Sequence, residues 1–469
     1  MITEKFSGKK AAVIGLGISN LPLIDFLREN GAEYIDVRDK DGRTERDYLE
    51  VNAKCEKLKA DGKINAYTIG DDYLKNLDAG FDYIFKTPGM RYDVPELLDA
   101  TSKGAVLTSE MEEFVKLCPC RLFAVTGSDG KTTTTTLIYK MLSEEYAGTG
   151  RKVYVGGNIG TPLLSKVSEM KSDDFAVLEL SSFQLMHTKI AADVAVITNI
   201  TPNHLDVHKS YDEYIEAKKV LLGSSCKVIN IDNEKTSEIY NGIHDNGDVR
   251  AFSRVKMTGY GTYLDGNTLV YGKNGQKTEL FDKSAIMIPG DHNVENYLAA
   301  TAAVFDYVSP ESMKKVAETF GGVEHRIELV RELNGVRYYN SSIDSSPNRS
   351  LKTLSVFPEK NVVMIAGGKD KGIPYDDIGA PILEKVKCLV LTGPTAEKIY
   401  DAVIGEAIIR EVMPPKIIMV EDFKEAVEFA HDNAEAGDIV LLSPASTSFD
   451  KFKNFEERGN LFKEIVMGF

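Results

Sequence analysis

The stretch Ala124-Val-Thr-Gly-Ser-Asp-Gly-Lys-Thr-Thr-Thr-Thr-Thr136 joins the end of an apolar strand to a glycine turn and to the beginning of a helix. Glycines let several backbone N–H groups converge on an anion, and the positive end of the helix adds to the attraction. In this order Lys131 can neutralise terminal phosphates and Thr132 can offer a hydroxyl to Mg²⁺. Val125 stands where the usual G-x-x-x-x-G-K-[ST] pattern has its first glycine. An ordinary glycine turn gives no reason for a lysine followed by hydroxyls, so the stretch predicts a phosphate-binding loop.

The composition is typical of a soluble enzyme. The chain has 469 residues, 43% of them hydrophobic and 27% charged, and a length of about 150 residues per domain predicts roughly three domains. The formal net charge of −15 argues against nucleic acid or an anionic membrane as the main partner. Residues 1–10 contain no signal-peptide core and no later segment is apolar enough to span a membrane, which predicts a cytoplasmic protein. Five cysteines, with only Cys118 and Cys120 close together, favour free thiols over disulfides or zinc.

A second glycine turn lies near the N-terminus. A short buried strand from Lys10 leads into Gly15-Leu-Gly-Ile-Ser-Asn20 and a helix. The next strand carries Asp36 and Arg38 near its end. They follow the glycines by about twenty residues, which is the spacing that a dinucleotide-binding unit requires. Because Asn20 replaces the third glycine, this fingerprint is incomplete. The segment predicts a nucleotide-like site in which Asp36 or Arg38 reaches a base or ribose.

Strands alternate with helices along most of the chain, which predicts α/β domains with mostly parallel sheets. Residues 106–114 are expected to form a linker and the start of a helix, and an alanine-rich helix is expected over residues 297–307. Glycines and short alternating runs in residues 243–283 predict an antiparallel excursion. We predict a Rossmann-like N-terminal unit over residues 1–108, a central domain with the phosphate-binding loop over residues 109–322 and a Rossmann-like C-terminal unit over residues 323–469.

Polar side chains follow two successive strands of the predicted central domain. Glu179 follows the first strand, and Asn199-Ile-Thr-Pro-Asn-His-Leu-Asp-Val-His208 follows the second. The carboxyl ends of parallel strands meet at one edge of a sheet, where open α/β sheets bind ligands. Glu179 and His204 could there hold a metal ion against phosphates bound near Lys131. Two alternatives stay open, namely that Glu179 caps a helix and that His204 is an ordinary histidine of a turn.

The chain carries four motifs in this order: Thr126-Gly-Ser-Asp-Gly-Lys-Thr132, Glu179-Leu-Ser-Ser-Phe-Gln184, Gly290-Asp-His-Asn-Val-Glu-Asn-Tyr-Leu-Ala-Ala300 and His325-Arg-Ile-Glu328. Together they resemble the ATP-dependent Mur ligases of peptidoglycan synthesis, over nearly the full length. Two further stretches most resemble the branch that adds D-glutamate to UDP-N-acetylmuramoyl-L-alanine: Asn203-His-Leu-Asp206, and Leu441-Leu-Ser-Pro-Ala-Ser-Thr-Ser-Phe-Asp450 with Phe452-Lys-Asn-Phe-Glu-Glu-Arg-Gly459. The resemblance implies ATP, two Mg²⁺ sites, small-molecule substrates and an acyl-phosphate intermediate. We expect a monomer without nucleic-acid or membrane partners.

Each matching position then implies a role. Lys218, in Tyr214-Ile-Glu-Ala-Lys218, matches the lysine that family members carbamylate, although without the resemblance it would be read as a helix-surface lysine. The implied catalytic residues are Lys131, Glu179, His204 and Lys218, and the implied metal ligands are Thr132, Glu179, His204 and the Lys218 carbamate. The implied ATP site comprises Gly127, Ser128, Asp129, Gly130, Lys131, Thr132, Thr133, Asn296 and Arg326. The implied UDP-substrate site comprises Ile18, Ser19, Asp36, Arg38, Gly89, Asn158, Ser181 and His204, and the implied amino-acid site comprises Ser345, Lys371, Ser448 and Phe455.

One loop departs from the pattern of that branch. The branch usually reads Asn-Asp-Ser-Lys-Ala-Thr-Asn, whereas this chain reads Asn340-Ser-Ser-Ile-Asp-Ser-Ser346. Ser341 therefore replaces an aspartate, Ile343 a lysine and Ser345 a threonine. The sequence leaves open whether Asp344 substitutes for the missing aspartate and how selective the amino-acid site is.

Other classes of protein explain the sequence less well. A related ligase, such as the alanine-adding enzyme or folylpolyglutamate synthase, would share the central domain but should differ in the terminal domains. A nucleotide-binding scaffold without catalysis would tolerate the loss of Glu179, His204 or Lys218, and all three are present. A dehydrogenase would use the N-terminal turn but would leave the loop around Lys131 unexplained.

Overall fold

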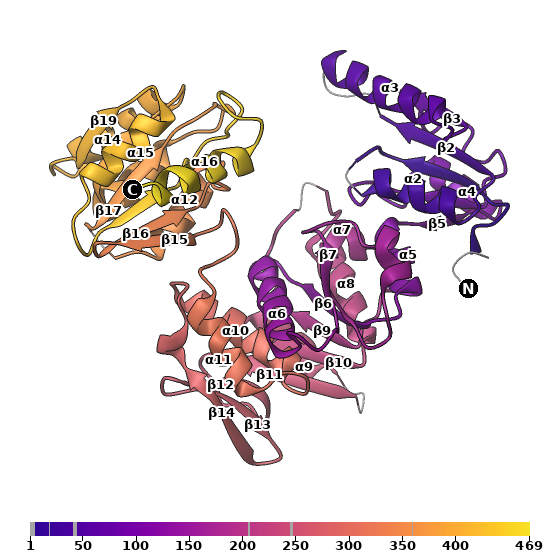
Figure 1. The fold of residues 1–469 in the computed structure, drawn as a ribbon, viewed down its shortest axis with the longest axis horizontal. Helices are drawn as coiled ribbons and strands as arrows, with labels where there is room; N and C mark the ends of the chain where they lie inside the picture. Colours follow the sequence, from indigo (N-terminus) through magenta and orange to yellow (C-terminus); the bar gives the residue numbers. More distant parts are fainter. Residues whose placement is uncertain (1–4, 18, 41–44, 205–206, 244–246, 359) are drawn as a thin grey trace. The chain divides into compact units, whose positions relative to one another are not determined.

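The computed structural model describes residues 5–17, 19–40, 45–204, 207–243, 247–358 and 360–469, and this part of the chain forms three β-sheets flanked by helices (Figure 1). The chain divides into two compact units. One unit comprises Met1–Asp282 and Glu295–Val316, and the other comprises Lys283–Val294 and Ala317–Phe469. The first two sheets lie in the first unit and the third sheet lies in the second. The predicted α/β class is confirmed.

The first sheet is parallel and has the strand order β3-β2-β1-β4-β5. Its order reverses between β1 and β4, and ligands of open α/β sheets bind at such a reversal. The expected linker at residues 106–108 is instead the edge strand β5, which pairs with β4, because three residues carry no readable alternation. The strands are β1 (Lys10–Ile14), β2 (Tyr34–Asp39), β3 (Ala66–Ile69), β4 (Tyr83–Phe85) and β5 (Val106–Thr108), and the helices are α2 (Asn20–Glu29), α3 (Glu45–Ala60), α4 (Pro95–Ser102) and α5 (Glu110–Leu117).

The second sheet has the order β14-β13-β12-β11-β10-β9-β6-β8-β7. Strands β6 to β12 are parallel, whereas β13 pairs antiparallel with both β12 and β14, which confirms the predicted antiparallel excursion. The strands are β6 (Arg121–Thr126), β7 (Val153–Gly157), β8 (Phe175–Glu179), β9 (Val194–Ile197), β10 (Cys226–Asn230), β11 (Asp248–Ser253), β12 (Tyr260–Asp265), β13 (Thr268–Lys273) and β14 (Gln276–Asp282). The α-helices are α6 (Lys131–Glu145), α7 (Ser182–Leu185), α8 (Tyr211–Lys219) and α9 (Glu234–Asn241), and the 3₁₀ turns are η1 (Leu164–Glu169) and η2 (Val220–Gly223).

The first two sheets share one hydrophobic core. Buried side chains of α2, such as Leu23 and Phe26, belong to the same cluster as Leu164 and Val167 of η1 and Leu178 of β8. Burial of apolar area contributes about 25 cal/mol per Å², so this shared core holds the N-terminal sheet and the central sheet together in one unit.

The chain between the second and third sheets is helical. The predicted alanine-rich helix α10 spans Asp291–Val304, so it begins and ends earlier than predicted, and an aspartate in its first turn favours that start. It is followed by α11 (Pro310–Thr319), and the short 3₁₀ turn η3 (Lys283–Ala285) precedes it.

The third sheet has the order β15-β16-β20-β17-β18-β19 and is parallel except for the β15–β16 pair. Side chains of α12, α13 and α14 form the core on one face, and side chains of α15 and α16 form the core on the other. The strands are β15 (Glu328–Leu333), β16 (Val336–Asn340), β17 (Val362–Ala366), β18 (Val386–Leu391), β19 (Lys416–Met419) and β20 (Ile439–Leu442). The helices are α12 (Pro347–Ser355), η4 (Asp376–Ile378), α13 (Gly379–Lys385), α14 (Ala396–Ile409), α15 (Phe423–Asp432) and α16 (Phe455–Met467).

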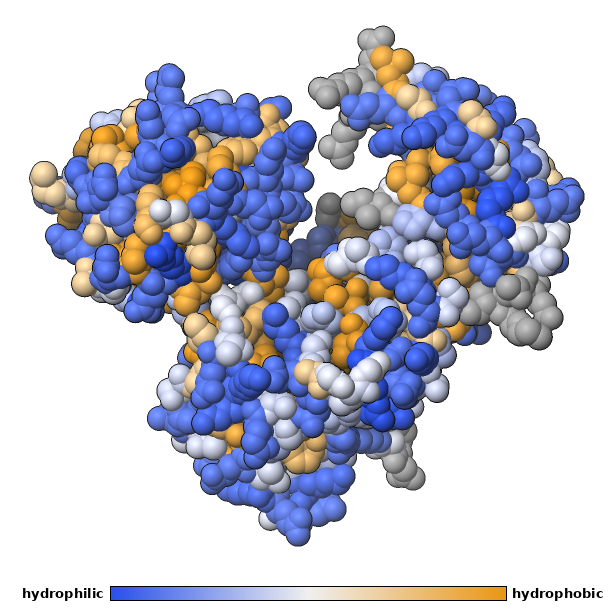
Figure 2. Space-filling view, in the orientation of Figure 1, coloured by the Kyte–Doolittle hydropathy of each residue, from blue (hydrophilic) through white to orange (hydrophobic). Residues whose placement is uncertain are grey.

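The surface carries mainly polar residues on the face seen in Figure 2, with scattered hydrophobic side chains between them. Within the described ranges, no helix is long and apolar enough to cross a membrane.

Candidate active site

The predicted phosphate-binding loop connects β6 to α6, and two of its glycines are required by the backbone and by their neighbours. Gly127 has φ of 151° and Gly130 has φ of 80°. A Cβ atom on Gly127 would lie 1.9 Å from Thr198 Oγ1, and one on Gly130 would lie 2.4 Å from Asn296 Oδ1. Only glycine fits both positions. Asn296, a predicted ATP contact, is thus placed against the loop, at whose end Lys131 begins α6.

Side chains that follow β9 hold this loop in shape. Thr198 Oγ1 donates to the carbonyl of Asp129 at 2.6 Å, and the Asp129 N–H donates to Asn199 Oδ1 at 2.8 Å. Lys131 Nζ donates to the carbonyl of Ser128 at 2.9 Å, within the loop itself. The loop is therefore braced by two residues, Thr198 and Asn199, to which the sequence analysis gave no role. They follow the strand that pairs with β6.

Glu179 ends β8 and lies beside the strand that carries the loop, since it pairs in register with Val125. Its side chain is buried, and Oε1 accepts a hydrogen bond from Asn158 Nδ2 at 2.8 Å. Its other oxygen, Oε2, is buried and has no hydrogen-bond partner among the described residues. A buried carboxylate oxygen without a partner is costly, and a divalent cation is the partner that such an oxygen prefers. Glu179 thus fits the metal that the fold family implies.

Glu179 does not cap a helix, which was the alternative interpretation. The N-cap of α7 is Ser181, whose hydroxyl accepts from the Gln184 N–H while the Gln184 side chain accepts from the Ser181 N–H. This capping box occupies the Ser181 hydroxyl.

Lys218 is almost fully buried at 1% exposure and is not a surface lysine. Its Nζ donates to the carbonyl of Gly127 at 2.8 Å and lies 4.5 Å from the centre of the Tyr214 ring. Burial and the nearby Lys131 cation lower the pKa of Lys218 to about 7. A neutral amine reacts with CO₂ whereas an ammonium does not, so this environment suits carbamylation.

His204 lies in the turn before α8. Its backbone has φ of 55°, its N–H donates to Asn203 Oδ1 at 2.9 Å, and its ring meets the Phe183 ring edge-on with centroids 5.2 Å apart. Among the residues that the structure describes, no three His, Cys, Asp or Glu side chains converge on one point. A metal site with His204 therefore remains a prediction.

The N-terminal glycine turn is braced by Asn20, the residue that replaces the third glycine. The Asn20 amide donates to the carbonyls of Ile14 at 2.9 Å and Gly15 at 2.8 Å. Asp39 Oδ2 accepts from the Leu16 N–H at 2.6 Å, a contact that sequence reasoning missed. A built Cβ on Gly15 would lie 3.2 Å from Thr87 Cβ, which places the turn against the loop after β4.

The other N-terminal site residues are distributed as follows. Asp36 and Arg38 are buried and paired with each other at 2.7 Å, while Asp36 Oδ1 is buried without a partner among the described residues. Ser19 is the N-cap residue of α2 and Gly89 is exposed. Ile18 lies outside the described residues.

The second unit contains the predicted amino-acid site. Ser448 is buried, Ser345 and Phe455 are half-buried and Lys371 is exposed. Arg458, which sequence reasoning missed, is buried between two loops. It donates to Ser342 Oγ at 3.0 Å and to the carbonyl of Ser446 at 3.2 Å.

The side chain of Asp344 lies in the interior of the second unit. It is 4% exposed, and Oδ2 accepts from Ser443 Oγ at 2.8 Å, while burial raises its pKa. Ser341 is also fully buried. Asp344 is thus held by internal hydroxyls rather than presented at the surface in place of the missing aspartate. Arg326 forms an isolated bridge with Val323 in the same unit.

Comparison with known proteins gives the same assignment. Residues 125–304 match the Mur ligase middle domain, and residues 325–446 match the Mur ligase glutamate ligase domain. Two proteins named UDP-N-acetylmuramoylalanine–D-glutamate ligase, from Ruminiclostridium cellulolyticum and Acetivibrio thermocellus, are each 52% identical to this chain. These alignments cover 98% and 99% of this chain and 96% and 97% of the relatives. The chain belongs to the Mur ligase family.

Solved structures show that the fold is also that of a Mur ligase. The UDP-N-acetylmuramate–alanine ligase MurC of Thermotoga maritima superposes with a TM-score of 0.57 at 19% identity, over 98% of this chain and 99% of that one. MurF of Acinetobacter baumannii gives a TM-score of 0.55 at 14% identity, over 99% of this chain and 92% of that one. The Mur ligase fold thus persists where most of the sequence has changed.

Proposed function

We propose that this Mur ligase joins the amine of D-glutamate to the alanyl carboxylate of UDP-N-acetylmuramoyl-L-alanine and splits ATP into ADP and phosphate. The substrates are inferred from the names of its relatives, to which it is similar over nearly the full length. The observation that carries the chemistry is the unpartnered Glu179 Oε2 beside the phosphate-binding loop. A buried carboxylate oxygen beside the loop supports a site for the Mg²⁺ that phosphoryl transfer from ATP requires.

The reaction has two steps. A carboxylate oxygen of the substrate attacks the γ-phosphorus, and the bond to the β,γ-bridging oxygen breaks, which gives an acyl phosphate and ADP. The amine of D-glutamate then attacks the acyl carbon, and the phosphate leaves with the amine proton. Lys131 offsets the negative charge on the phosphates, and the glycine turn directs backbone N–H groups toward them.

Bound Mg²⁺ would supply Lewis-acid stabilisation of the phosphate charge. We propose two such ions, held by Thr132, Glu179, His204 and a carbamylated Lys218. The burial of Lys218 and its lowered pKa support the carbamate. Counting bound Mn²⁺ by electron paramagnetic resonance tests the number of ions.

The remaining site residues keep their proposed roles. ATP is contacted by Gly127, Ser128, Asp129, Thr133, Asn296 and Arg326. The UDP-linked substrate is contacted by Ser19, Asp36, Arg38, Gly89, Asn158 and Ser181. D-Glutamate is contacted by Ser345, Lys371, Ser448 and Phe455. The proposed domains are residues 1–108, 109–322 and 323–469. We propose a cytoplasmic monomer, which sedimentation of the purified chain and fractionation of the producing cells test.

A panel of amino acids tests the function. Phosphate release is measured with UDP-N-acetylmuramoyl-L-alanine, ATP, Mg²⁺ and either D-glutamate, L-glutamate or glycine, and with each component omitted in turn. We expect release only when D-glutamate and all other components are present. Equal turnover with L-glutamate or glycine would refute the assigned specificity, and no release with the complete mixture would refute the proposed reaction.

A further inference from the structure

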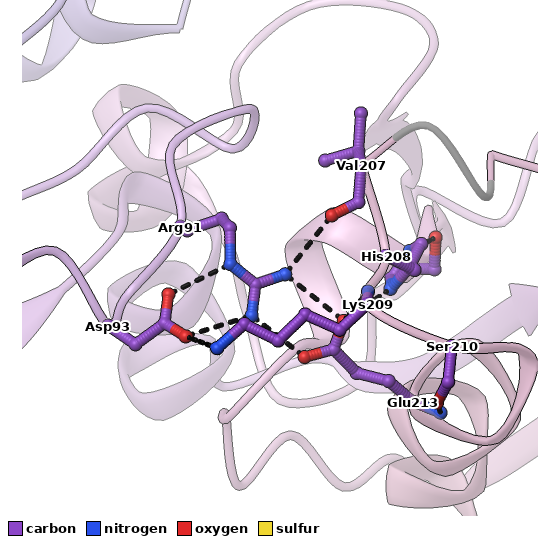
Figure 3. A network of polar contacts seen from close by, with 8 residues as sticks. Arg91, Asp93, Val207, His208, Lys209, Ser210 and Glu213 are labelled. Carbon is purple, nitrogen blue, oxygen red and sulfur yellow. Dashed lines mark hydrogen bonds and ion pairs between the residues drawn. The ribbon is translucent and has the colours of Figure 1, made fainter.

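A group of charged residues joins the loop after β4 to the start of α8 (Figure 3). We name it the Arg91 clamp and define it as Arg91, Asp93, Lys209 and Glu213. Arg91 donates to both oxygens of Asp93 at 2.8 and 3.0 Å and to both oxygens of Glu213 at 2.8 and 3.0 Å. Lys209 Nζ also pairs with Asp93. One guanidinium thus holds two carboxylates from segments far apart in the sequence.

The clamp is partly buried and joins Arg91 to each carboxylate by two hydrogen bonds. The side chains of Arg91, Asp93 and Glu213 are 20%, 19% and 19% exposed. Hydrogen bonds from Arg91 lower the pKa of Glu213 to about 2 and also lower the pKa of Asp93, so both remain charged at neutral pH. A two-pronged contact between arginine and a carboxylate fixes orientation as well as distance.

On one side, the clamp is connected to the phosphate-binding loop through α8. Glu213 lies in the first turn of α8, where its N–H donates to Ser210 Oγ at 3.1 Å. One residue later, the Tyr214 hydroxyl lies 2.8 Å from Ser128 Oγ in the loop. One helical turn further, Lys218 reaches the carbonyl of Gly127. The helix is therefore tied to the clamp at its start and to the phosphate loop along its length.

The clamp also holds the turn that contains His204. Arg91 donates to the carbonyl of Val207 at 3.2 Å, and the Val207 N–H donates to the carbonyl of His204 at 3.2 Å. His208 is buried, lies 3.5 Å from Glu213 Oε2 through Nδ1, and shares a hydrogen bond of 2.9 Å with Ser182 Oγ through Nε2. The position of this turn thus depends on Arg91 and Glu213.

On the other side, the clamp is connected to the N-terminal glycine turn. Arg91 and Asp93 directly follow the loop in which Thr87 packs against Gly15. Residues 87–93 of the chain therefore link the glycine turn to the clamp, and hydrogen bonds link the clamp to α8 and α8 to the phosphate loop.

We propose that Arg91 and Glu213 are positioning residues, which set the place of the His204 turn and of Lys218 relative to the loop that binds the UDP-linked substrate. This inference rests on the proposed function of the site. Neither residue is among the proposed catalytic or metal-binding residues, so their effect is transmitted through the backbone of the turn and through α8. A displacement of about 1 Å at a catalytic group can cost as much as a hundredfold in rate.

The test compares Glu213→Gln with wild type and with Lys103→Met. Glu213→Gln keeps the size of the side chain but removes the charge that Arg91 holds. Lys103→Met removes ion pairs of similar length, 2.6 Å to Asp78 and 2.9 Å to Asp99, which have no connection to the site. The kcat, the KM for D-glutamate, the Mg²⁺ concentration that gives half-maximal turnover and the melting temperature are measured for each protein.

We expect Glu213→Gln to lower kcat by about tenfold and to raise the half-maximal Mg²⁺ concentration several-fold, with KM for D-glutamate unchanged. Lys103→Met should match wild type in all three kinetic values. A purely structural role would lower the melting temperature but leave the Mg²⁺ dependence unchanged, and that result would overturn the inference.

A second comparison, with Arg91→Lys, keeps the inference testable if Glu213→Gln folds poorly. In Arg91→Lys the positive charge remains but the fork that holds two carboxylates is lost. We expect the same rise in the Mg²⁺ requirement. The double variant Arg91→Lys/Glu213→Gln should be no worse than the more affected single variant, because both substitutions break the same contact between Arg91 and Glu213. Additive losses would overturn the inference. Absence of turnover in the wild type would instead refute the proposed function.

Discussion

Replacement of Lys218 by alanine tests whether a buried amine is converted into a carboxylate. The pKa of this lysine is lowered from the ordinary 10.5 to about 7. At pH 7 about half of the Lys218 side chains are therefore neutral, against about 0.03% for an ordinary lysine, a difference of roughly 1,500-fold. Since only the neutral amine adds CO₂, the lowered pKa supports the proposed carbamylation of Lys218 at neutral pH.

The expected loss follows from the position of the side chain. Lys218 Nζ lies 2.8 Å from the carbonyl of Gly127, so a carbamate there would place a negative charge beside the phosphate-binding loop. We expect Lys218→Ala to lower kcat by about 10² to 10³, the size of effect that removal of one preorganised electrostatic group produces. A short carboxylic acid such as acetate would fill the space that is left and would supply the carboxylate of the proposed carbamate.

The assay is phosphate release at pH 7.5, with and without acetate, for wild type and for Lys218→Ala. We expect acetate to restore part of the activity of the variant and to leave the wild type unchanged. In parallel, ¹³C-bicarbonate should give the wild type, but not the variant, a carbamate signal in the ¹³C NMR spectrum. Full activity of Lys218→Ala without acetate, or a wild type that turns over without a carbamate signal, refutes this reasoning.

The same pKa has a consequence for stability. The unfolded chain keeps the proton of Lys218 up to about pH 10.5, whereas the folded chain loses it near pH 7. Between these values the unfolded state binds more protons, so the contribution of Lys218 to the free energy of unfolding rises with pH by up to about 1.4 kcal/mol per pH unit. Urea unfolding of wild type and Lys218→Met in CO₂-free buffer at pH 7.5 and 9 measures this difference. An unchanged difference between the two proteins would show that the amine has an ordinary pKa.

Three further substitutions test the phosphate-binding loop and its metal. Lys131→Ala should abolish turnover and leave the circular dichroism spectrum unchanged, because Lys131 is proposed to neutralise phosphate charge. Retained activity would exclude the loop from the mechanism. Gly130→Ala should weaken ATP binding at least tenfold and destabilise the protein by about 1–2 kcal/mol, because φ is 80° and the new Cβ would lie 2.4 Å from Asn296 Oδ1. The matched control is Gly405→Ala, at a helical glycine with open space around it. This substitution should stabilise the protein by about 1 kcal/mol. Equal ATP affinity in the two variants would contradict the prediction. Glu179→Gln should raise the Mg²⁺ requirement by at least tenfold in a titration of turnover, and an unchanged requirement would remove Glu179 from the metal site.

The backbone of the predicted phosphate-binding loop could be predicted because the residues that determine it are neighbours in the sequence. The order of strand, glycines, lysine and hydroxyls in residues 124–136 requires a particular backbone, and the structure has it, with α6 beginning at Lys131. The antiparallel excursion was likewise predictable from alternation and glycine content. Strand β5 was mistaken for a linker because three residues are too few to show a period.

The Arg91 clamp could not be predicted in this way. Arg91 and Glu213 are 122 positions apart. No periodicity in the sequence relates a residue in a loop of the first sheet to the first turn of a helix between strands of the second sheet. The bracing of the phosphate loop by Thr198 and Asn199 is of the same kind, since it depends on the pairing of β9 with β6.

By itself, the sequence determined the class of fold, the strand, glycine turn and helix around Lys131, and the family, because strand–turn–helix order and motif spacing are properties of the chain. Only the tertiary structure decided the chemical state of individual side chains. Lys218 would read as a surface lysine, yet it is buried against the turn after β6, and this burial and the Lys131 cation lower its pKa to about 7. Asp344 would read as a replacement ligand, yet it is buried among hydroxyls from α12 and the loop after β20. Both outcomes depend on desolvation, which is set by residues distant in the sequence that folding brings together.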